Sequence, residues 1–82
     1  MFLAAQISLY PLRQTHLSPA INDAVSILKE RGLDVTEGTM SSVASGDDEA
    51  LFDALKDIYR KSTEQGDVVM VVTLSNACPV SR

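Results

Sequence analysis

Polar side chains at alternate positions of one short stretch are the residues of this chain best suited to bind a small molecule. Gln6, Ser8 and Tyr10 lie on one face if the stretch is a β-strand, because successive side chains of a strand point to opposite faces. Their amide and hydroxyl groups can form hydrogen bonds with a small heterocycle, and the ring of Tyr10 can stack on it. Three further hydroxyl-bearing residues are expected on the same surface: Ser42, Thr73 and Ser75.

The same surface supports a second interpretation, in which it packs against the sheet of another subunit. Small side chains and the apolar Val69 and Val71 suit such an interface as well as they suit a binding platform. The two interpretations are compatible if ligand sites lie at the edges of a dimer interface. We therefore expect a small-molecule partner and a homo-oligomer formed through this surface.

Residues that could perform catalysis are few. His16 follows in a loop without a carboxylate at a fixed spacing, so we expect a solvated side chain rather than a general base. The run Asp47-Asp48-Glu49 has the residue types of a metal site, but helix capping explains it completely. Arg13 resembles the arginine of the acylphosphatase loop, yet the glycine-bearing loop that would direct N–H groups at a phosphate is missing. We predict no catalytic residue, no metal site and no cofactor.

Length and charge limit the classes of protein that remain. A chain of 82 residues is expected to form a single domain over residues 1–82. Its net charge of −4 and the lack of a basic cluster argue against nucleic acid as a partner. No apolar run approaches the roughly 18 residues that a membrane-spanning helix needs. The lone Cys78 permits no internal disulfide, and no basic segment precedes the first strand, so we expect a cytoplasmic protein.

The pattern of apolar residues predicts two helices and four strands. The first strand covers 2–10, with Leu3, Ala5, Ile7 and Leu9 toward the core, and Pro11 ends it. The next segment is a helix from Ser18-Pro19 to Arg31, closed by Gly32, whose apolar stripe consists of Ile21, Ala24, Val25 and Leu28. A strand over 33–36 follows. A second helix follows Asp47, with an inward stripe of Leu51, Ala54, Leu55 and Ile58, and ends at Gly66; the last strand covers 68–75.

The third strand has the weakest pattern. We predict it from about Met40 to Ser45, after a turn at Glu37-Gly38, with Val43 toward the core. Ser42 and Ala44 then lie on the opposite face, beside the polar residues of the first strand.

The order strand, helix, strand, strand, helix, strand predicts an α+β fold, the ferredoxin-like βαββαβ sandwich. It has a four-stranded antiparallel sheet with two helices on one face. Right-handed crossovers place the first and third strands in the centre and the fourth beside the first.

Three stretches of the chain resemble the YkoF-type domains that bind thiamine and hydroxymethylpyrimidine. They are Ala5-Gln6-Ile7-Ser8-Leu9-Tyr10-Pro11-Leu12, Ser45-Gly46-Asp47 leading into Leu51-Phe52-Asp53-Ala54-Leu55, and the ending from Val68 to Pro79. They occur in the same order and at similar spacing over nearly the whole chain. The resemblance implies a ferredoxin-like domain without enzymatic activity that binds thiamine or its pyrimidine precursor in vitamin salvage or transport.

The resemblance also assigns the ligand contacts. They would be the hydroxyl, amide and phenol groups of Gln6, Ser8, Tyr10, Ser42, Thr73 and Ser75. Ser42 stands where a threonine is expected in the family, which keeps the hydroxyl and loses a methyl contact. The YkoF protein carries two such domains in one chain, and a homodimer of this chain would restore that arrangement.

Three classes of function therefore compete. The first is a binding protein for thiamine or its hydroxymethylpyrimidine moiety. The second is an oligomeric interaction or regulatory module without a ligand of its own, and the third is a small hydrolase.

Overall fold

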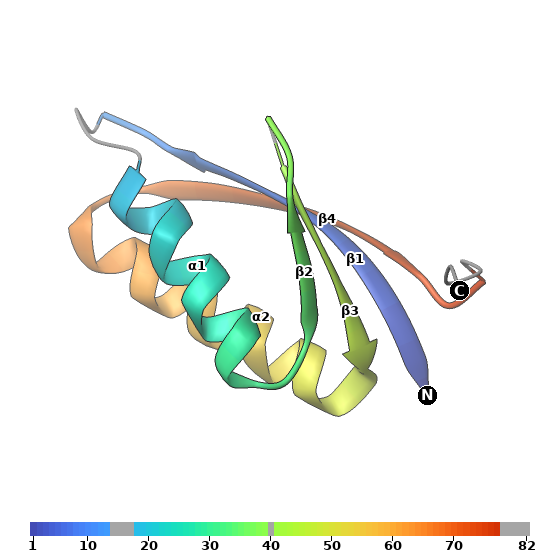
Figure 1. The fold of residues 1–82 in the computed structure, drawn as a ribbon. Coiled ribbons are helices and arrows are strands. Elements are labelled where there is room, and N and C mark those ends of the chain that lie inside the picture. Colours follow the sequence, from blue (N-terminus) through green and yellow to red (C-terminus); the bar gives the residue numbers. More distant parts are fainter. Residues whose placement is uncertain (14–17, 40, 78–82) are drawn as a thin grey trace.

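The structure is a computed structural model that describes residues 1–13, 18–39 and 41–77. The elements along the chain are β1 (Phe2–Pro11), α1 (Ser18–Glu30), β2 (Asp34–Glu37), β3 (Ser42–Asp47), α2 (Asp48–Ser62), a 3₁₀ turn (Thr63–Gln65) and β4 (Val68–Ser75) (Figure 1). The expectations for His16, Met40 and Cys78 fall outside the described residues.

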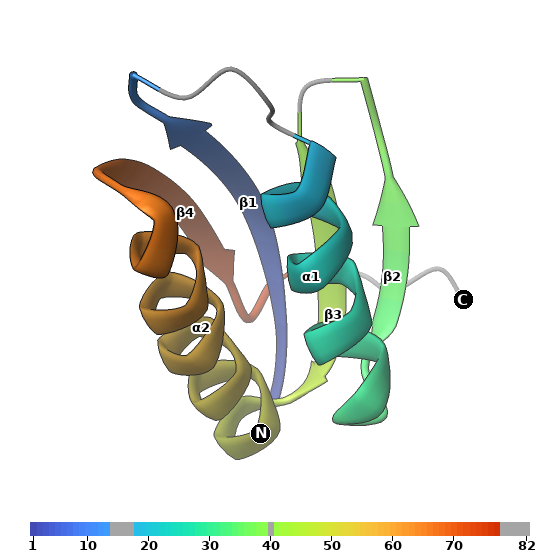
Figure 2. The ribbon, with the colours of Figure 1, turned by 90° about the vertical axis from the view of Figure 1, so that its left-hand side faces the viewer.

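The four strands form one antiparallel sheet in the order β2-β3-β1-β4. Both helices pack on the same face of this sheet, with α2 on the β4 side and α1 on the side of β3 and β2 (Figure 2). This is the ferredoxin-like α+β arrangement predicted from the sequence, and the predicted strand order is confirmed. The opposite face, here called the open face, is formed by Ala4, Gln6, Ser8 and Tyr10 of β1, Val43 and Ser45 of β3, and Val69, Val71, Thr73 and Ser75 of β4.

The alternation predicted for β1 is confirmed. Leu3, Ala5 and Ile7 are buried in the core, and the half-buried Leu9 packs against it. Gln6 and Tyr10, which alternate with them, are exposed on the open face. The strand therefore presents its apolar side chains to the helices and its polar ones to the open face.

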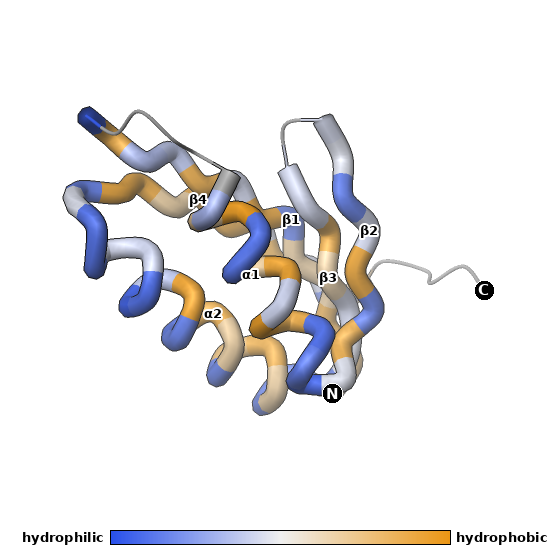
Figure 3. The backbone as a smooth tube through the Cα atoms, turned by 60° about the vertical axis from the view of Figure 1, so that its left-hand side comes forward, coloured by the Kyte–Doolittle hydropathy of each residue, from blue (hydrophilic) through white to orange (hydrophobic). Residues whose placement is uncertain are grey.

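The helices cover the sheet through their predicted apolar stripes. Leu28 of α1 and Leu51 and Ile58 of α2 are the largest fully buried side chains. Figure 3 shows hydrophilic residues along the outer side of α2 and hydrophobic ones toward the sheet. Burying a side chain of this size contributes about 1.5–3 kcal/mol, so these three residues anchor the two layers.

The side-chain facing predicted for β3 is wrong by one residue. Val43 is 43% exposed on the open face, whereas Ala44 is 0% exposed in the core. The sheet pairs Val43 with Gln6, which lies on the open face, and Ala44 with Ala5, which lies in the core. Both pairs therefore give the same side-chain facing for β3. It follows that Ser42 faces the helices, opposite Ile7, and does not share the open face with Gln6.

Close packing explains why β3 turns its small residues inward. The helix-facing side of the strand consists of Ser42, Ala44 and Gly46. A Cβ atom added to Gly46 would lie 2.6 Å from Cδ2 of Leu33, so the buried side chain of Leu33 would have to shift to admit it. A valine pointing into this layer would overpack it, and overpacked cores lose about 1–3 kcal/mol.

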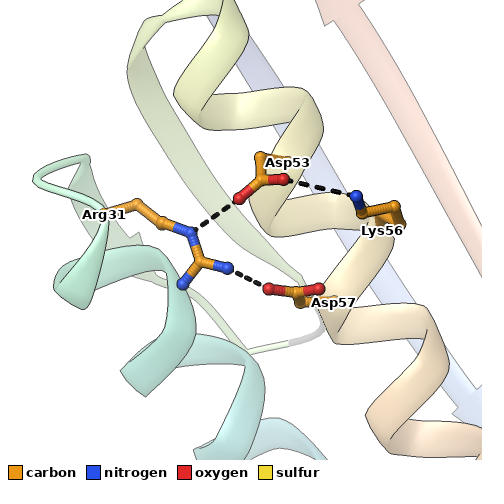
Figure 4. A network of polar contacts seen from close by, with 4 residues as sticks. All are labelled: Arg31, Asp53, Lys56 and Asp57. Atoms are coloured by element: carbon orange, nitrogen blue, oxygen red, sulfur yellow. Dashed lines mark hydrogen bonds and ion pairs between the residues drawn. The ribbon is translucent and has the colours of Figure 1, made fainter.

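A polar network joins the two helices at one end of the layer (Figure 4). The Nε atom of Arg31, which follows α1, donates to Oδ2 of Asp53 at 3.0 Å, and its guanidinium also pairs with Asp57. Asp53 also pairs with Lys56, three residues later on α2, at 3.4 Å. The hydrogen bond from Arg31, followed by that from Lys56, lowers the pKa of Asp53.

Candidate functional site

The two ladders of β1 have different lengths, and this difference creates a fork in the sheet. β1 pairs with β3 only as far as Ile7, opposite Ser42, but it continues beside β4 to Pro11, opposite Val68. The β2–β3 hairpin and the end of β1 therefore diverge, and α1 lies below the place where they separate (Figure 2). The separation leaves room for a pocket between the strands and the helix.

This space, here called the fork pocket, has a volume of about 260 Å³. It is lined by Ile7, Leu9 and Tyr10 of β1, Ile21, Ala24 and Leu28 of α1, and Glu37, Gly38, Thr39, Ser41 and Ser42 of the hairpin. One wall is thus aliphatic, while the hairpin side carries a carboxylate and three hydroxyl groups. An apolar cavity with a few convergent polar groups is the usual form of a small-molecule site.

The turn of the hairpin holds its polar residues in place. The backbone N–H of Gly38 donates to the carbonyl oxygen of Ser41 at 2.7 Å, which closes the turn. On the opposite face of the sheet, Nε2 of Gln6 donates to Oγ of Ser41 at 3.1 Å. Gln6 therefore ties the hairpin to β1 beside the fork pocket, although its own side chain lies on the open face.

The backbone of Leu9 faces the fork. The N–H of Leu12 donates to the carbonyl of Asp67, beside β4, and the carbonyl of Met1 accepts from Asp48, on the β3 side. Because the backbone groups of a strand alternate between its two edges, Leu9 directs its N–H and C=O to the β3 side. No described residue pairs with them there. Leu9 thus offers an adjacent donor and acceptor to the pocket that its side chain lines.

The structure places five of the six predicted site residues in two separate hollows. Tyr10 and Ser42 both line the fork pocket, although they belong to opposite faces of the sheet, because Tyr10 lies where β1 has separated from β3. Gln6, Thr73 and Ser75 line a second hollow of about 290 Å³ on the open face, here called the open-face depression. Its remaining lining is Ala4, Ala5, Val43 and Ala77. Ser8 lines neither, and contact of any of the six with a ligand stays a prediction.

The open-face depression is less enclosed than the fork pocket, and its polar groups are less available to a ligand. Gln6 and Thr73 are paired across β1 and β4, and the N–H of Ala77 donates to Oγ of Ser75 at 3.1 Å. The amide of Gln6 is already committed to Ser41. The side chains of Gln6 and Ser75 thus already have a hydrogen-bond partner each, and small apolar side chains form the rest of its floor.

The sequence interpretation missed Glu37, Thr39 and Ile21 as pocket residues. Glu37 was assigned to a turn, yet it shares a face with the core residue Val35, two positions earlier on β2. Ile21 was assigned to the core stripe, and the structure leaves it 39% exposed over the pocket. The alternation of β2 was the signal that could have revealed Glu37.

The titratable groups with displaced pKa values lie in ion pairs outside both hollows. The N-terminal ammonium of Met1, 3.2 Å from Oδ1 of Asp48, lowers the pKa of that carboxyl chiefly through a hydrogen bond. Within the described ranges, no three His, Cys, Asp or Glu side chains are placed to hold a metal ion. These ion pairs stabilise the start of α2, through Asp48, and the end of α1, through Arg31.

None of the helices in the described ranges is long and apolar enough to span a membrane.

Comparison with known proteins identifies a family. The model of the YkoF-related family matches residues 3–81 of the chain. No protein with a curated description matches it.

Several solved structures share the fold. A hypothetical protein of Methanocaldococcus jannaschii is 22% identical with a TM-score of 0.85, over 98% of this chain and 84% of that one. A domain of unknown function from Bacillus cereus is 17% identical with a TM-score of 0.76, over 92% and 75%. A Thermotoga maritima protein, assigned provisionally to thiamine biosynthesis or salvage, is 17% identical with a TM-score of 0.78, over 92% and 83%. At identities this low, the likeness shows the fold alone.

Proposed function

Since the chain belongs to the YkoF-related family, we propose that it is a non-catalytic protein that binds thiamine or its hydroxymethylpyrimidine moiety, in vitamin salvage or transport. The observation that carries the proposal is the fork pocket, where aliphatic walls meet hydroxyl groups, a carboxylate and a free strand edge. The provisional assignment of the Thermotoga maritima neighbour to thiamine biosynthesis or salvage agrees with it.

The pyrimidine ring suits the fork pocket in size. The pocket, at about 260 Å³, is somewhat smaller than the roughly 300–1,000 Å³ typical of sites for drug-sized ligands. It therefore accommodates one substituted ring rather than the whole vitamin. In thiamine, the thiazolium ring would then lie at the mouth of the pocket.

The polar groups suit the edge of an aminopyrimidine. Such a ring presents an amino donor beside a ring-nitrogen acceptor, and the backbone C=O and N–H of Leu9 provide the complementary pair. Ser42 can bond the hydroxymethyl group, and Tyr10 offers a flat contact. Glu37 at the rim would attract the positive charge of the thiazolium ring.

Ser8, Thr73 and Ser75 could contact a ligand only in the alternative placement, on the open face. The sequence interpretation put all six site residues on the open face, and the open-face depression is a hollow on that face. The better-enclosed fork pocket is our choice, because enclosure removes more apolar ligand surface from water.

A matched pair of serines separates the two placements. Ser42 and Ser45 lie on the same strand and are both partly buried, but they face opposite sides of the sheet. Calorimetric titration should show that Ser42→Ala lowers the affinity for hydroxymethylpyrimidine by about one to two decades, because one buried hydrogen-bonding group is left unpaired. The affinity of Ser45→Ala should equal that of the wild type.

The same titration can reject the proposal at two levels. Full affinity in Ser42→Ala together with a loss in Thr73→Val would move the ligand to the open face. Absence of binding of both hydroxymethylpyrimidine and thiamine by the folded wild type would remove the proposed function.

A second proposal concerns the open face, through which we infer that the chain forms a homo-oligomer. Three valines on this face, Val43, Val69 and Val71, are between 43% and 50% exposed. Val43 lies on β3 and the other two lie on β4, on either side of β1. Apolar side chains exposed on one face of a sheet are typical of interfaces. A monomer mass by light scattering at high micromolar concentration would contradict the oligomer.

A further inference from the structure

The end of the β2–β3 hairpin extends past the last residue pair that joins it to β1 (Figure 2). That last pair is Ile7 with Ser42, and the turn beyond it is closed by the bond from Gly38 to Ser41. Burial does little to hold this end of the hairpin, since Glu37 and Gly38 are exposed. Segments with few buried contacts open locally at low cost, so the hairpin wall of the fork pocket depends on a further contact.

Gln6 provides such a contact between β1 and the hairpin. Its Nε2 donates to Oγ of Ser41 at 3.1 Å. Gln6 is paired directly with Val43, so Ser41 is its diagonal neighbour, two residues nearer the turn. Diagonal neighbours in a sheet lie about 7–8 Å apart, which a long side chain can span. Among the described residues, no other side-chain hydrogen bond joins β1 to this hairpin.

Gln6 is placed to act on the fork pocket without touching what the pocket holds. Its side chain lies on the open face and does not line the pocket, whereas Ser41 and the adjacent Ser42 do. A displacement of Ser41 would carry Ser42 with it, because the two residues are consecutive. We propose that Gln6 is a positioning residue of the fork pocket, which holds the hairpin wall beside β1 through its hydrogen bond to Ser41.

The consequence for ligand binding rests on the proposed function. A wall that is already held in place loses less conformational freedom when a ligand binds, and this raises the affinity. Loss of the bond between Gln6 and Ser41 should therefore weaken the binding of hydroxymethylpyrimidine about three- to tenfold, the effect of one ordinary hydrogen bond.

Two substitutions of similar length separate the hydrogen bond from the bulk of the side chain. Gln6→Glu keeps the bond, because the hydroxyl of Ser41 can donate to the carboxylate, whereas the thioether in Gln6→Met is at most a weak acceptor. Calorimetric titration with the uncharged hydroxymethylpyrimidine should show wild-type affinity in Gln6→Glu and the three- to tenfold loss in Gln6→Met. Ser45→Ala, which removes a hydroxyl from the open face away from the turn, should leave the affinity unchanged.

The Ser41→Ala background distinguishes positioning from direct contact between Gln6 and the ligand. Without the hydroxyl of Ser41 the bond is already absent, so adding Gln6→Met should cause no further loss of affinity. A loss of the same size in both backgrounds would mean that Gln6 contacts the ligand itself, and would overturn the proposal.

The backbone offers a probe of the hairpin that needs no ligand. The carbonyl of Met1 accepts from Asp48, so alternation directs the amides of Ser42 and Ala44 toward β1. Ser42 belongs to the last rung of this ladder, next to the bond from Gln6, and Ala44 belongs to the rung before it. Exchange at Ser42 therefore reports on the end of the hairpin, and exchange at Ala44 serves as the control.

Residue-resolved hydrogen exchange without ligand tests the positioning itself. The amide of Ser42 should exchange about three- to tenfold faster in Gln6→Met than in the wild type and in Gln6→Glu, with Ala44 unchanged. Equal exchange at Ser42 in all three folded proteins would overturn the proposal. Faster exchange at Ser42 in Gln6→Met, together with no binding of hydroxymethylpyrimidine or thiamine by the wild type, would support the positioning and remove the proposed function alone.

Discussion

The two faces of the sheet differ in how they can hold another molecule. On the helix-covered face, α1 closes the place where β1 leaves β3, and the result is an enclosed pocket with an aliphatic wall. On the open face the strands remain paired, and the hollow over Ala4 is floored by small side chains. An enclosed site therefore depends on the end of a ladder, whereas the regularly paired part of the sheet offers a surface for another subunit.

The largest expected difference between the faces is in folding stability. Ile7→Ala removes a side chain that is 4% exposed in the core, and should lower the free energy of unfolding by about 2–5 kcal/mol. Val71→Ala, on the open face of β4, should cost less than about 1 kcal/mol in the monomer. Urea denaturation at low protein concentration measures both, and equal losses would mean that the open face is buried within the monomer.

The facing of β3 predicts a smaller difference. Ala44→Val adds volume to a position that is fully buried and should destabilise by about 1–3 kcal/mol. Val43→Ala, one residue earlier, should have little effect on the monomer. Thermal denaturation compares the two variants, and the reverse order would restore the facing first predicted from the sequence.

A carboxylate at the rim should distinguish the two proposed ligands of the fork pocket. Glu37→Gln should weaken thiamine binding about two- to fivefold, the effect of one exposed charge pair, while hydroxymethylpyrimidine, which is uncharged, should bind nearly as before. Titrations in low and high salt should show the thiamine difference shrinking as salt rises. Equal losses for both ligands would place Glu37 against the pyrimidine instead.

The smallest expected effect is the pH dependence of folding stability that arises from the Arg31–Asp53 contact between the two helices. Arg31 holds the pKa of Asp53 below its ordinary value of 3.8, so this contact stabilises the fold above that pH. The contribution is lost as pH falls below 3.8 and Asp53 becomes protonated. Asp53→Asn should therefore be less stable than the wild type at neutral pH, and the gap should close in acid. Both residues are partly exposed, which keeps the effect small. A gap that persists in acid would exclude this origin.

The sequence alone was sufficient to predict the buried face of each element that has a strong pattern of apolar side chains. β1 alternates over its whole length, and β4 and both helices carry several large apolar residues, so their facing could be predicted. β3 contains one large apolar residue, and a single Val43 satisfies either facing. The deciding contact is the approach of Leu33 to Gly46, which comes from another element and leaves no local pattern.

The candidate site was only partly predictable for a similar reason. Tyr10 and Ser42 were grouped correctly in one place, but through a shared face that they do not have. They meet because the ladder between β1 and β3 ends at Ile7, and the end of a ladder depends on the pairing of two strands. Glu37 was missed because a hairpin turn and a pocket rim have the same residue types.

The most direct test of the central claim is a nuclear magnetic resonance titration with hydroxymethylpyrimidine. Backbone amide shifts report on each face of the sheet separately. We predict saturable changes at the amides of Leu9, Gly38 and Ser42 around the fork pocket, with Thr73 and Ser75 unchanged. Changes confined to Thr73, Ser75 and their neighbours on the open face would contradict the assignment of the ligand to the fork pocket.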